Sequence, residues 1–270
     1  MKLEVLMSCM HQKDESLLKT SRLTGDVVII NQCDWEDYAE YPTETGTARM
    51  FSVRQRGLTK SRNLAIEKSL GDICLLCDDD EVFVPDYEAG ILDAYEKLPQ
   101  ADVLIFNMAN HPISLPNRVM KLRFPQTMKV CSWQISFRRE RLRQANVRFD
   151  ELLGAGTGNG GEEELKFLTD CEKAGLSIYY VPFVIASVAQ ESSTWFHGFT
   201  EQFFENRGAT TRYILGSATA SAYALYYIVR KRKLYRQDIT PAAALKATFR
   251  GIRENKIEKQ AKRLKEPAVR

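Results

Sequence analysis

Three consecutive aspartates, Asp78-Asp79-Asp80, are the residues of this sequence best suited to carry chemistry. They follow directly after the apolar run Ile-Cys-Leu-Leu-Cys at residues 73–77. Like charges on consecutive residues repel one another, so we expect a partner that neutralises them. A hard divalent cation that bridges carboxylate and phosphate oxygens is such a partner. The alternative is a solvated acidic turn without a ligand, but the position of the triplet at the end of an apolar run favours the cation site.

An apolar run of this length is typical of a buried strand, and open α/β sheets bind ligands at the carboxyl ends of their strands. Similar runs recur along the chain with helical segments between them, which predicts a largely parallel sheet. Extended segments are expected at residues 3–7, 27–31, 73–77, 103–108, 130–137 and 178–184. Helices are expected at residues 11–20, 58–70 and 85–97. Residues 110–125 contain three prolines and are expected to form an irregular connection.

Length and composition limit the organisation of the chain. A chain of 270 residues can bury one large α/β core, with room for an appendage. The six cysteines are scattered in or beside apolar runs, as reduced cytosolic thiols are. Residues 1–7 form a short apolar stretch that contains an acid, which is typical of a first strand and not of a signal peptide. The pattern becomes helical after about residue 196, so we expect a main domain at 1–205 and a basic helical extension at 206–270.

Charge is distributed unevenly along the sequence. From Arg230 to the C-terminus there are 14 Lys or Arg and 4 Asp or Glu, a local excess of +10. The preceding residues carry 24 basic and 31 acidic side chains, a balance of −7. An acidic body with a basic tail indicates contact with an anionic partner, either a membrane surface or nucleic acid.

The tail begins with an uncharged segment. Residues 213–229 carry no charge and precede four basic residues at 230–233. Seventeen residues that include Gly, Ser and Thr are marginal for a bilayer span, so a buried or interfacial helix is favoured. Further on, Leu245, Phe249 and Ile252 fall on one face of a basic amphipathic helix. Such a helix suits an anionic leaflet, and packing on the rest of the protein is the alternative.

Three stretches, in this order, resemble a known family. They are residues 57–66 (GLTKSRNLAI), residues 77–81 (CDDDE) and residues 158–168 (GNGGEEELKFL). Their order and spacing resemble the family 2 glycosyltransferases of the GT-A fold, whose nucleotide-sugar domain carries an Asp-x-Asp motif. The resemblance covers roughly the first 205 residues. It implies an α/β fold, with a Rossmann-like, mostly parallel central sheet flanked by helices and a C-terminal helical extension.

The resemblance also implies roles for the residues of the first two stretches. It assigns Mn²⁺ or Mg²⁺ to Asp80, and it assigns Asp78 to the metal or the ribose; Asp79 belongs to the nucleotide site in a less definite role. When bound, such a cation stabilises a departing diphosphate as a Lewis acid. The arginine of the family that matches Arg62 helps to hold the nucleotide, and Asn63 lies beside it. A guanidinium suits uracil carbonyls or phosphate oxygens, whereas the alternative for Arg62 is a solvent-facing helix position.

Two expected strand ends supply further nucleotide-binding candidates. Ser8 and Cys9 follow the first strand, and Asn31 and Asp34 lie at the end of the second. The resemblance places these residues near the nucleoside, with Asp34 as a partner for the base. Asn31 and Asp34 could equally be residues that form turns.

The third stretch supplies the catalytic candidates. Glu162-Glu163-Glu164 lies where similar enzymes have a Glu-Asp pair whose second acid removes the proton of the acceptor hydroxyl. The match assigns this role to Glu163, with Glu in place of Asp, and leaves Glu162 as a competitor. The alternative is that these acids only complement the dipole at a helix N-terminus. Similar enzymes also place a metal-binding histidine after the last strand, for which His197 is the candidate, with a packing role as its alternative.

These features together predict a metal-dependent, inverting glycosyltransferase that uses a nucleotide sugar, with a UDP-sugar expected. The expected acceptor is a hydroxyl of a glycan or a lipid-linked carrier in bacterial surface or capsular polysaccharide synthesis. The expected location is the cytoplasm, with peripheral contact of the basic C-terminal region with the inner face of the plasma membrane. One alternative is a nucleotidyltransferase that makes the donor, although the first strand is not followed by a Gly-rich loop ending in Arg-x-x-Pro. The other is a nucleic-acid-binding protein that uses the basic tail, which leaves the aspartates unexplained, so no nucleic-acid partner is expected.

Overall fold

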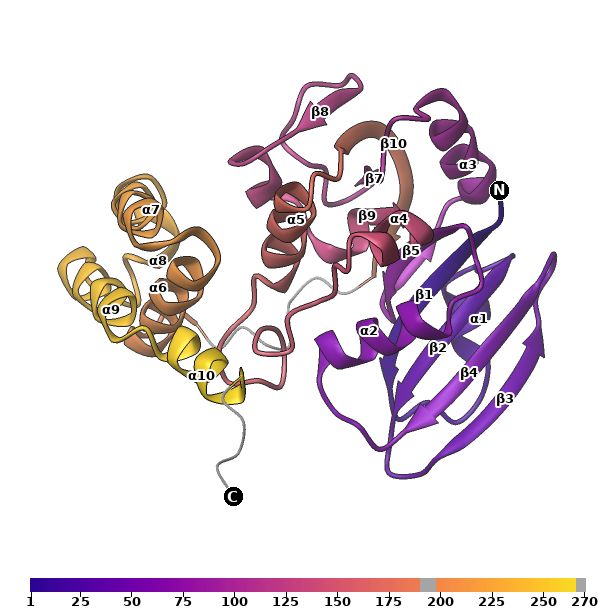
Figure 1. The fold of residues 1–270 in the computed structure, drawn as a ribbon, viewed down its shortest axis with the longest axis horizontal. Helices are drawn as coiled ribbons and strands as arrows, with labels where there is room; N and C mark the ends of the chain where they lie inside the picture. The colour runs from indigo at the N-terminus through magenta and orange to yellow at the C-terminus, as the bar shows by residue number, and fades with distance from the viewer. Residues whose placement is uncertain (190–197, 266–270) are drawn as a thin grey trace. The chain divides into compact units, whose positions relative to one another are not determined.

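A computed structural model describes residues 1–189 and 198–265, and the chain divides into two compact units (Figure 1). The first unit comprises Met1–Phe149 and Glu164–Glu191, and the second comprises Asp150–Glu163 and Ser192–Arg270. The loop at 150–163 therefore belongs with the C-terminal helices, although it lies far from them in the sequence. The predicted functional division after residue 205 stays a prediction.

The first unit is built on one ten-stranded sheet. Its strands are β1 (Leu3–Met10), β2 (Asp26–Gln32), β3 (Asp37–Pro42), β4 (Thr47–Val53), β5 (Ile73–Asp78), β6 (Glu81–Phe83), β7 (Val103–Met108), β8 (Met120–Leu122), β9 (Ile135–Arg138) and β10 (Ile178–Val188). The strand order is β3-β4-β2-β1-β5-β9-β7-β10-β6, and β8 pairs with β10. β4, β2, β1 and β5 are parallel to one another, as are β7 and β10, whereas β9 is antiparallel to β5 and β7. This arrangement confirms the predicted α/β fold with a mostly parallel central sheet.

Helices cover both faces of this sheet. They are α1 (Ser16–Thr20), α2 (Leu58–Lys68), α3 (Tyr87–Lys97), α4 (Arg139–Gln144) and α5 (Glu163–Lys173). Successive side chains of a strand point to opposite faces. Val5 of β1 therefore shares a core cluster with residues of α1 and α3, whereas Leu6 shares the opposite cluster with residues of α2, α4 and α5. The sheet is thus buried on both sides, which explains why its central strands are continuous apolar runs in the sequence.

The parallel register aligns the carboxyl ends of the central strands. Ser8 on β1 lies opposite Ile30 on β2 and Asp78 on β5. Cys9 lies opposite Asn31. The polar residues that follow three separate apolar runs are therefore brought to one edge of the sheet.

Some elements differ from the sequence-based expectation. The segment 11–20 is helical only over Ser16–Thr20, and His11 has a positive φ of 54°, which is incompatible with a helix. The segment 130–137 is extended only at its end, because a 3₁₀ turn at Ser132–Gln134 precedes β9. The edge hairpin of β3 and β4 was not predicted. β3 lies mostly exposed at the edge of the sheet, so it lacks the apolar run by which the buried strands are detected.

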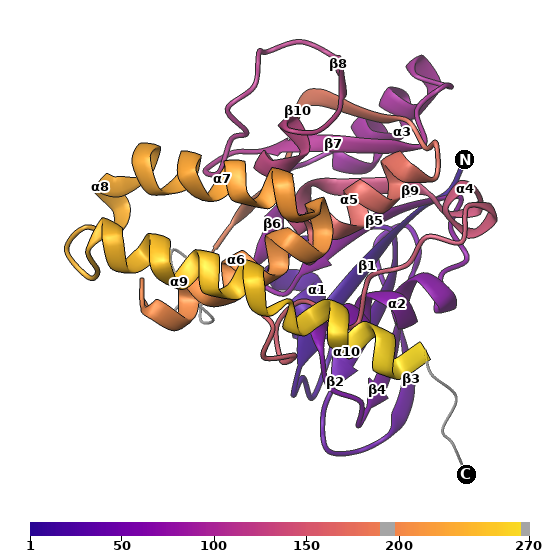
Figure 2. The ribbon, with the colours of Figure 1, turned by 60° about the vertical axis from the view of Figure 1, so that its left-hand side comes forward.

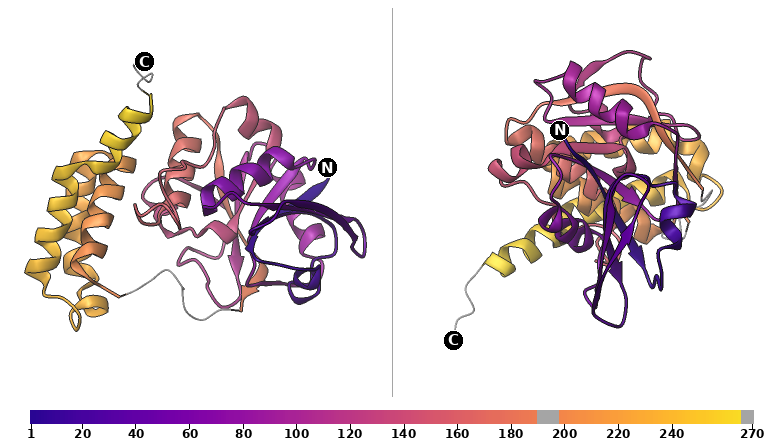
Figure 3. Two further views of the ribbon diagram at one scale, coloured as in Figure 1. Left: turned by 90° about the horizontal axis from the view of Figure 1, so that it is seen from below. Right: turned by 90° about the vertical axis from the view of Figure 1, so that its right-hand side faces the viewer.

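The second unit consists of helices together with the loop at 150–163. Its helices are α6 (Glu201–Leu215), α7 (Ser217–Arg230), α8 (Arg232–Tyr235), α9 (Pro241–Glu254) and α10 (Lys256–Lys265). α6 and α9 pack side by side, with α7 against both (Figure 2). A Cβ atom on Gly208 of α6 would collide with the carbonyl of Thr248, and one on Gly251 of α9 would collide with the carbonyl of Glu205. The two glycines therefore allow the backbones of α6 and α9 to approach closely, as the orange and yellow helices in the left view of Figure 3 show.

The uncharged segment 213–229 is not one helix. It is divided at Gly216, which has a positive φ of 79° and separates α6 from α7. Within the described part of the chain, no helix combines the length and the hydropathy needed to cross a bilayer.

Candidate active site

A buried arginine joins α2 to the aspartate triplet. The side chain of Arg62 is 2% exposed, and its Nη2 donates hydrogen bonds to Oδ1 of Asp78 at 2.9 Å and to Oγ of Ser132 at 2.8 Å. The guanidinium also lies 5.6 Å from the ring centroid of Phe149, within the range of a cation–π contact. The alternative that Arg62 is a solvent-facing helix residue is therefore wrong.

The start of α2 is anchored to the same edge of the sheet. Gly57, which precedes the helix, has a φ of 121° and donates its backbone N–H to Oε1 of Gln32 at the end of β2. One helical turn later, Ser61 donates to Oγ of Ser8 at 2.8 Å. Two consecutive residues of α2 therefore bond to neighbouring strand ends, Ser61 to Ser8 on β1 and Arg62 to Asp78 on β5.

The turn after β5 gathers four carboxylates. Glu81 is 1% exposed, and its Oε1 accepts a hydrogen bond from the backbone N–H of Asp78 at 2.6 Å. Its other oxygen, Oε2, is buried without a hydrogen-bond partner among the described residues. Burial raises the pKa of Glu81 well above its usual range, and the charge of Asp78 adds to the shift. Desolvation and the charge of Asp78 likewise raise the pKa values of Asp79 and Asp80, so the turn has an excess of negative charge that a cation would relieve.

This donor set fits a hard cation that takes only part of its coordination from the protein. Within residues 1–189 and 198–265, no three His, Cys, Asp or Glu side chains converge where a metal ion could sit. Mg²⁺ is commonly bound by one or two carboxylates, with water and substrate phosphates completing its shell. Asp80 and Asp78 would supply oxygen ligands of this kind, and the Oε2 atom of Glu81, which has no partner among the described residues, lies at the start of β6 directly after them.

A histidine that the sequence did not single out lies near this turn. Desolvation and the two neighbouring aspartates raise the pKa of Asp80, but the charge of His111 opposes them. The ring of His111 lies 6.4 Å from that of Trp133, whose Nε1 is buried without a partner in the described part of the chain. The only signal in the sequence was that His111 falls within the expected irregular connection at 110–125. His197, the predicted histidine, lies outside the described residues.

Asn31 and Cys9 are both buried beside the strand ends. The amide of Asn31 donates to the carbonyl of Gln12 at 2.8 Å and to Oγ of Ser52 at 3.0 Å, and its Oδ1 accepts from the backbone N–H of Gln12 at 2.9 Å. Asn31 therefore fixes the segment after β1 to its neighbours. Burial raises the pKa of the Cys9 thiol, which keeps it neutral.

Asp34 and Asn63 lie in contrasting surroundings. The side chain of Asp34 is 81% exposed and pairs with Nη2 of Arg56 at 2.5 Å, so it is accessible to a ligand. The amide of Asn63, in contrast, donates to the carbonyl of Phe149 and accepts from its N–H, both at 2.9 Å. The side chain of Asn63 thus fixes the backbone of Phe149 to α2.

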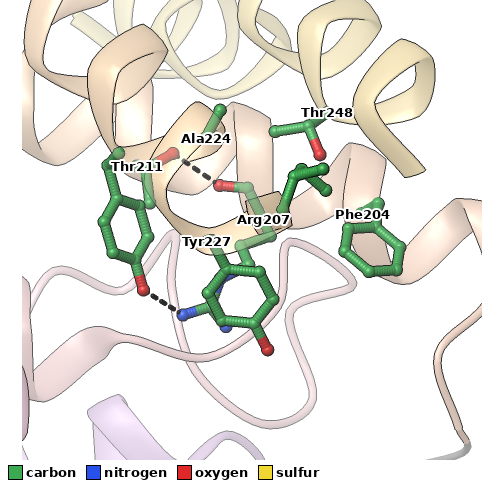
Figure 4. Close-up of a pocket in the computed structure, with 8 residues that line it drawn as sticks. Phe204, Arg207, Thr211, Ala224, Tyr227 and Thr248 are labelled. Atoms are coloured by element: carbon green, nitrogen blue, oxygen red, sulfur yellow. Dashed lines mark hydrogen bonds between the residues drawn. The ribbon is translucent and has the colours of Figure 1, made fainter. Parts of the chain in front are cut away.

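Glu162 and Glu163 of the third stretch belong to the second unit, whereas Glu164 belongs to the first. Oε1 of Glu162 lies 3.2 Å from Nη2 of Arg207 on α6. The same guanidinium lies 4.2 Å from the ring centroid of Tyr227 and donates to the hydroxyl of Tyr223 at 2.6 Å (Figure 4). Burial raises the pKa of Glu162, the charge of Arg207 opposes this shift, and the carboxylate of Glu163 adds to it. The carboxylate of Glu162 therefore pairs with a guanidinium that also contacts two tyrosine side chains.

Arg207 and its surroundings line a small cavity in the second unit (Figure 4). The empty volume is about 220 Å³, and the lining residues are Phe204, Arg207, Thr211, Tyr223, Ala224, Tyr227, Ile228 and Thr248. The lining comes from α6, α7 and α9, so the cavity lies within the helical packing.

Glu163 has different surroundings from those of Glu162. It is the first residue of α5 and is 7% exposed. An acid at this position complements the helix dipole, so the structural alternative for Glu163 stays open. The loop that carries it is fixed to α6, where Thr210 donates to the carbonyl of Asn159 at 2.8 Å and Tyr213 donates to Oδ2 of Asp150 at 2.6 Å.

Comparison with known proteins was made by sequence and by structure. The sequence model described as "Glycosyl transferase family 2" matches residues 15–158, just over half of the chain. Curated proteins gave no match by sequence.

Similar solved structures share the fold at low sequence identity. S. aureus TarS has a TM-score of 0.55 and 14% identity, over 88% of this chain and 45% of TarS. Residues 1–349 of S. aureus TarS in complex with UDP-GlcNAc give a TM-score of 0.56 and 14% identity, over 88% of this chain and 74% of that one. The mannosyltransferase PcManGT from Pyrobaculum calidifontis, in complex with GDP-Man and Mn²⁺, gives 0.53 and 13%, over 96% and 88%. The chain thus spans less than half the length of the complete TarS chain, and the likeness confirms the predicted GT-A fold.

Proposed function

The chain belongs to glycosyl transferase family 2, and we propose that it transfers a sugar from a nucleotide-sugar donor to a hydroxyl group of an acceptor. The observation that carries this proposal is the buried pair of Arg62 and Asp78, at 2.9 Å, beside the carboxylate turn at the strand ends. A buried guanidinium next to unneutralised carboxylates suits a ligand that has both phosphate oxygens and a bound cation.

The proposed donor is a UDP-sugar. Ser8, Cys9 and Asn31 would line the nucleoside end of the site, and the exposed Asp34 would accept a hydrogen bond from the base. Arg62, with Asp78 and Asp79, would hold the sugar-bearing end of the nucleotide. The similar structures were determined with UDP-GlcNAc or with GDP-Man and Mn²⁺, so both nucleotide classes belong in the test.

Mn²⁺ or Mg²⁺ is the proposed cofactor, and Asp80 and Asp78 are the residues that would hold it. When bound, the cation stabilises the negative charge of the departing diphosphate as a Lewis acid. Asn63 and His197 keep their predicted roles only as proposals, because Asn63 is hydrogen-bonded to Phe149 and His197 lies outside the described residues.

Glu163 is the proposed catalytic base. Its carboxylate would accept the proton of the acceptor hydroxyl while the hydroxyl oxygen forms a bond to the anomeric carbon of the donor. The bond between that carbon and the diphosphate breaks at the same time, and the nucleoside diphosphate leaves from the opposite face, which inverts the configuration. The ion pair of Glu162 with Arg207 supports the choice of Glu163, because it holds the carboxylate of Glu162 against a side chain of α6.

The proposed acceptor is a glycan or a lipid-linked carrier in bacterial surface polysaccharide synthesis, and the proposed compartment is the cytoplasm. All six cysteines are free thiols, which suits a reducing compartment. A nucleotide sugar from the cytoplasm and a carrier in the membrane would meet at the inner face of the plasma membrane.

The test is a panel of UDP- and GDP-sugars scored by thermal shift and by metal-dependent hydrolysis, with Mn²⁺, with Mg²⁺ and with EDTA. One donor with Mn²⁺ is expected to stabilise the wild type, by about 2.7 kcal/mol at a ligand concentration of 100 Kd. Asp80→Asn is expected to abolish the metal-dependent part of this response. Asp93→Asn is the matched control, because Asp93 is an exposed residue of α3 that pairs with Lys97 on the same helix.

Other outcomes would contradict the proposal. Stabilisation by nucleoside triphosphates with release of pyrophosphate would indicate a nucleotidyltransferase. Stabilisation by an oligonucleotide, with a steep salt dependence and without response to any nucleotide sugar, would indicate a nucleic-acid-binding protein.

A further inference from the structure

The last two turns of α7 carry large apolar side chains on both sides, but only one side is covered. Ala220, Ala224, Tyr227 and Ile228 are buried in the packing of the second unit. On the opposite side, Leu225 is 51% exposed, Tyr226 is 53% exposed and Val229 is 72% exposed. Surface helices normally place polar residues on the side that faces away from the core. The outer side of the last two turns of α7, from Leu225 to Val229, therefore presents large apolar side chains to water directly before the basic residues.

A group of unpaired cations continues from this apolar face. Residues 230–233 are Arg-Lys-Arg-Lys, and all four are exposed. None of the ion pairs in the described part of the chain involves any of them. The next exposed apolar residue is Leu234 of α8, at 58%. Residues 217–237 contain no Asp or Glu, so the local charge is entirely positive.

We propose that Leu225, Tyr226, Val229 and Leu234, together with the basic residues 230–233, form a face that docks on an anionic lipid surface. These eight residues are the docking face. Exposed apolar side chains enter the boundary between headgroups and acyl chains, and basic side chains beside them pair with anionic headgroups. α7 and α8 rest on this surface and do not cross it.

Two other occupants fit the docking face less well. A second copy of this chain, bound about a two-fold axis, would bring its own four cations against these four, without an acid in residues 217–237 to separate them. A nucleic acid would pair with the cations but would leave the three apolar side chains of α7 in water. A bilayer with anionic headgroups satisfies both kinds of side chain.

This inference deepens the proposed function, since a lipid-linked acceptor would lie at the surface on which the face docks. Only the role of the docking face in reaching a lipid-linked acceptor rests on the proposed function; binding of the face to lipid does not. Donor binding is measured without vesicles, and vesicle binding is measured without donor. Failure of one therefore does not imply failure of the other.

The test is co-sedimentation of the full chain with phosphatidylcholine vesicles that contain either no phosphatidylglycerol or about 30% of it. The wild type is expected to bind the anionic vesicles more than about 50-fold more tightly than the neutral ones. Replacing Arg230, Lys231, Arg232 and Lys233 by Gln should weaken binding by more than about 50-fold, because each basic residue near the surface contributes about fivefold before screening by salt. Leu225→Ser with Val229→Ser should weaken binding by about tenfold while all charges are kept.

The matched control removes the same charge elsewhere in the same unit. Arg253, Lys259, Lys262 and Arg263 are exposed residues of α9 and α10, and replacing all four by Gln should weaken binding less than threefold. All variants are checked by circular dichroism and by their thermal shift with donor, which should equal that of the wild type.

Three results would overturn the proposal. The first is equal loss of binding in the control and in the docking-face variant, which would indicate non-specific attraction by the whole basic region. The second is no binding of the wild type to anionic vesicles. The third is a dimer in sedimentation velocity that Leu225→Ser with Val229→Ser converts to a monomer without a change in vesicle binding.

Discussion

The ion pair of Glu162 and Arg207 makes a quantitative prediction about the second unit. The two charges are 3.2 Å apart, and the side chains are 19% and 23% exposed. At an effective dielectric constant of ~20, charges at this distance attract by about 5 kcal/mol. Desolvation of both groups offsets much of this attraction, and the contact of Arg207 with the Tyr227 ring adds about 1 kcal/mol.

We therefore expect a clear non-additivity when both residues are changed. Arg207→Met should lower the free energy of unfolding by about 3 kcal/mol, and Glu162→Gln should lower it by about 2 kcal/mol. Once one partner is gone the other contributes little, so the double variant should lose about 3 kcal/mol, which leaves a coupling of about 2 kcal/mol. Arg207→Lys keeps the charge but loses the planar fork, and should fall between the wild type and Arg207→Met.

The assay is urea denaturation followed by circular dichroism at 222 nm, to which the helices of the second unit contribute strongly. The matched control is the pair of Arg250 and Glu205, at 2.6 Å in the same unit, with Arg250 36% exposed. Because that arginine is more exposed, its coupling should be clearly smaller than that of Glu162 and Arg207. A coupling below about 0.5 kcal/mol for Glu162 and Arg207 would refute the view that this pair fixes the loop to α6.

Four further predictions concern catalysis and stability. Glu163→Gln should bind the donor with the affinity of the wild type in thermal shift but lose at least about 100-fold in turnover, because the catalytic base is gone. Glu162→Gln should keep most of the turnover. The reverse pattern would show that Glu162 is the base. Arg62→Lys should weaken donor binding by about tenfold in calorimetry, because a lysine keeps the charge but lacks the bidentate geometry of a guanidinium. Unchanged affinity would argue against a contact between Arg62 and the nucleotide. Gly208→Ala should lower the free energy of unfolding by more than about 2 kcal/mol, because its methyl group meets a backbone carbonyl. Desolvation of the buried Glu4 is outweighed by hydrogen bonds that include those from Ser69 and a backbone amide, so the pKa of Glu4 is lowered. The ionised carboxylate therefore stabilises the fold at pH 7, and this stabilisation is lost as the pH falls below about 4. Glu4→Gln should accordingly lower the free energy of unfolding at pH 7 but not at pH 3. A cost of Glu4→Gln that is equal at pH 3 and pH 7 in urea titrations would contradict that assignment.

Much of the first unit follows from local patterns in the sequence. The central strands are buried on both faces, so they are continuous apolar runs with clear ends. The residues at those ends, Ser8 and Asp78, could be picked out because polar residues directly after such runs must lie at the carboxyl edge of the sheet. The hairpin of β3 and β4 could not be predicted in this way, because the exposed edge strand β3 needs few apolar residues and so forms no apolar run.

The partners of the predicted residues were beyond the reach of the sequence. Arg62 could be predicted to contact phosphate, but its bond to Ser132 joins residues 70 positions apart. Asn63 was predicted to bind nucleotide, yet its amide pairs with the backbone of Phe149, 86 positions away. Contacts of this kind depend on which loops the sheet order brings together, and no local pattern encodes that order.

The sequence by itself determined which groups are candidates to carry chemistry, because each candidate group is a local feature. These features are the carboxylates after a buried strand, the arginine of the helix that precedes that strand, and the glutamates after a glycine-rich loop. Tertiary structure alone decided how those groups are neutralised. Packing places Arg62 against Asp78 and Arg207 against Glu162, and it leaves one oxygen of the buried Glu81 without a partner among the residues that the structure describes. The reason is that the protonation and reactivity of a carboxylate depend on burial and on the nearest charge, and both are set by residues distant in the chain.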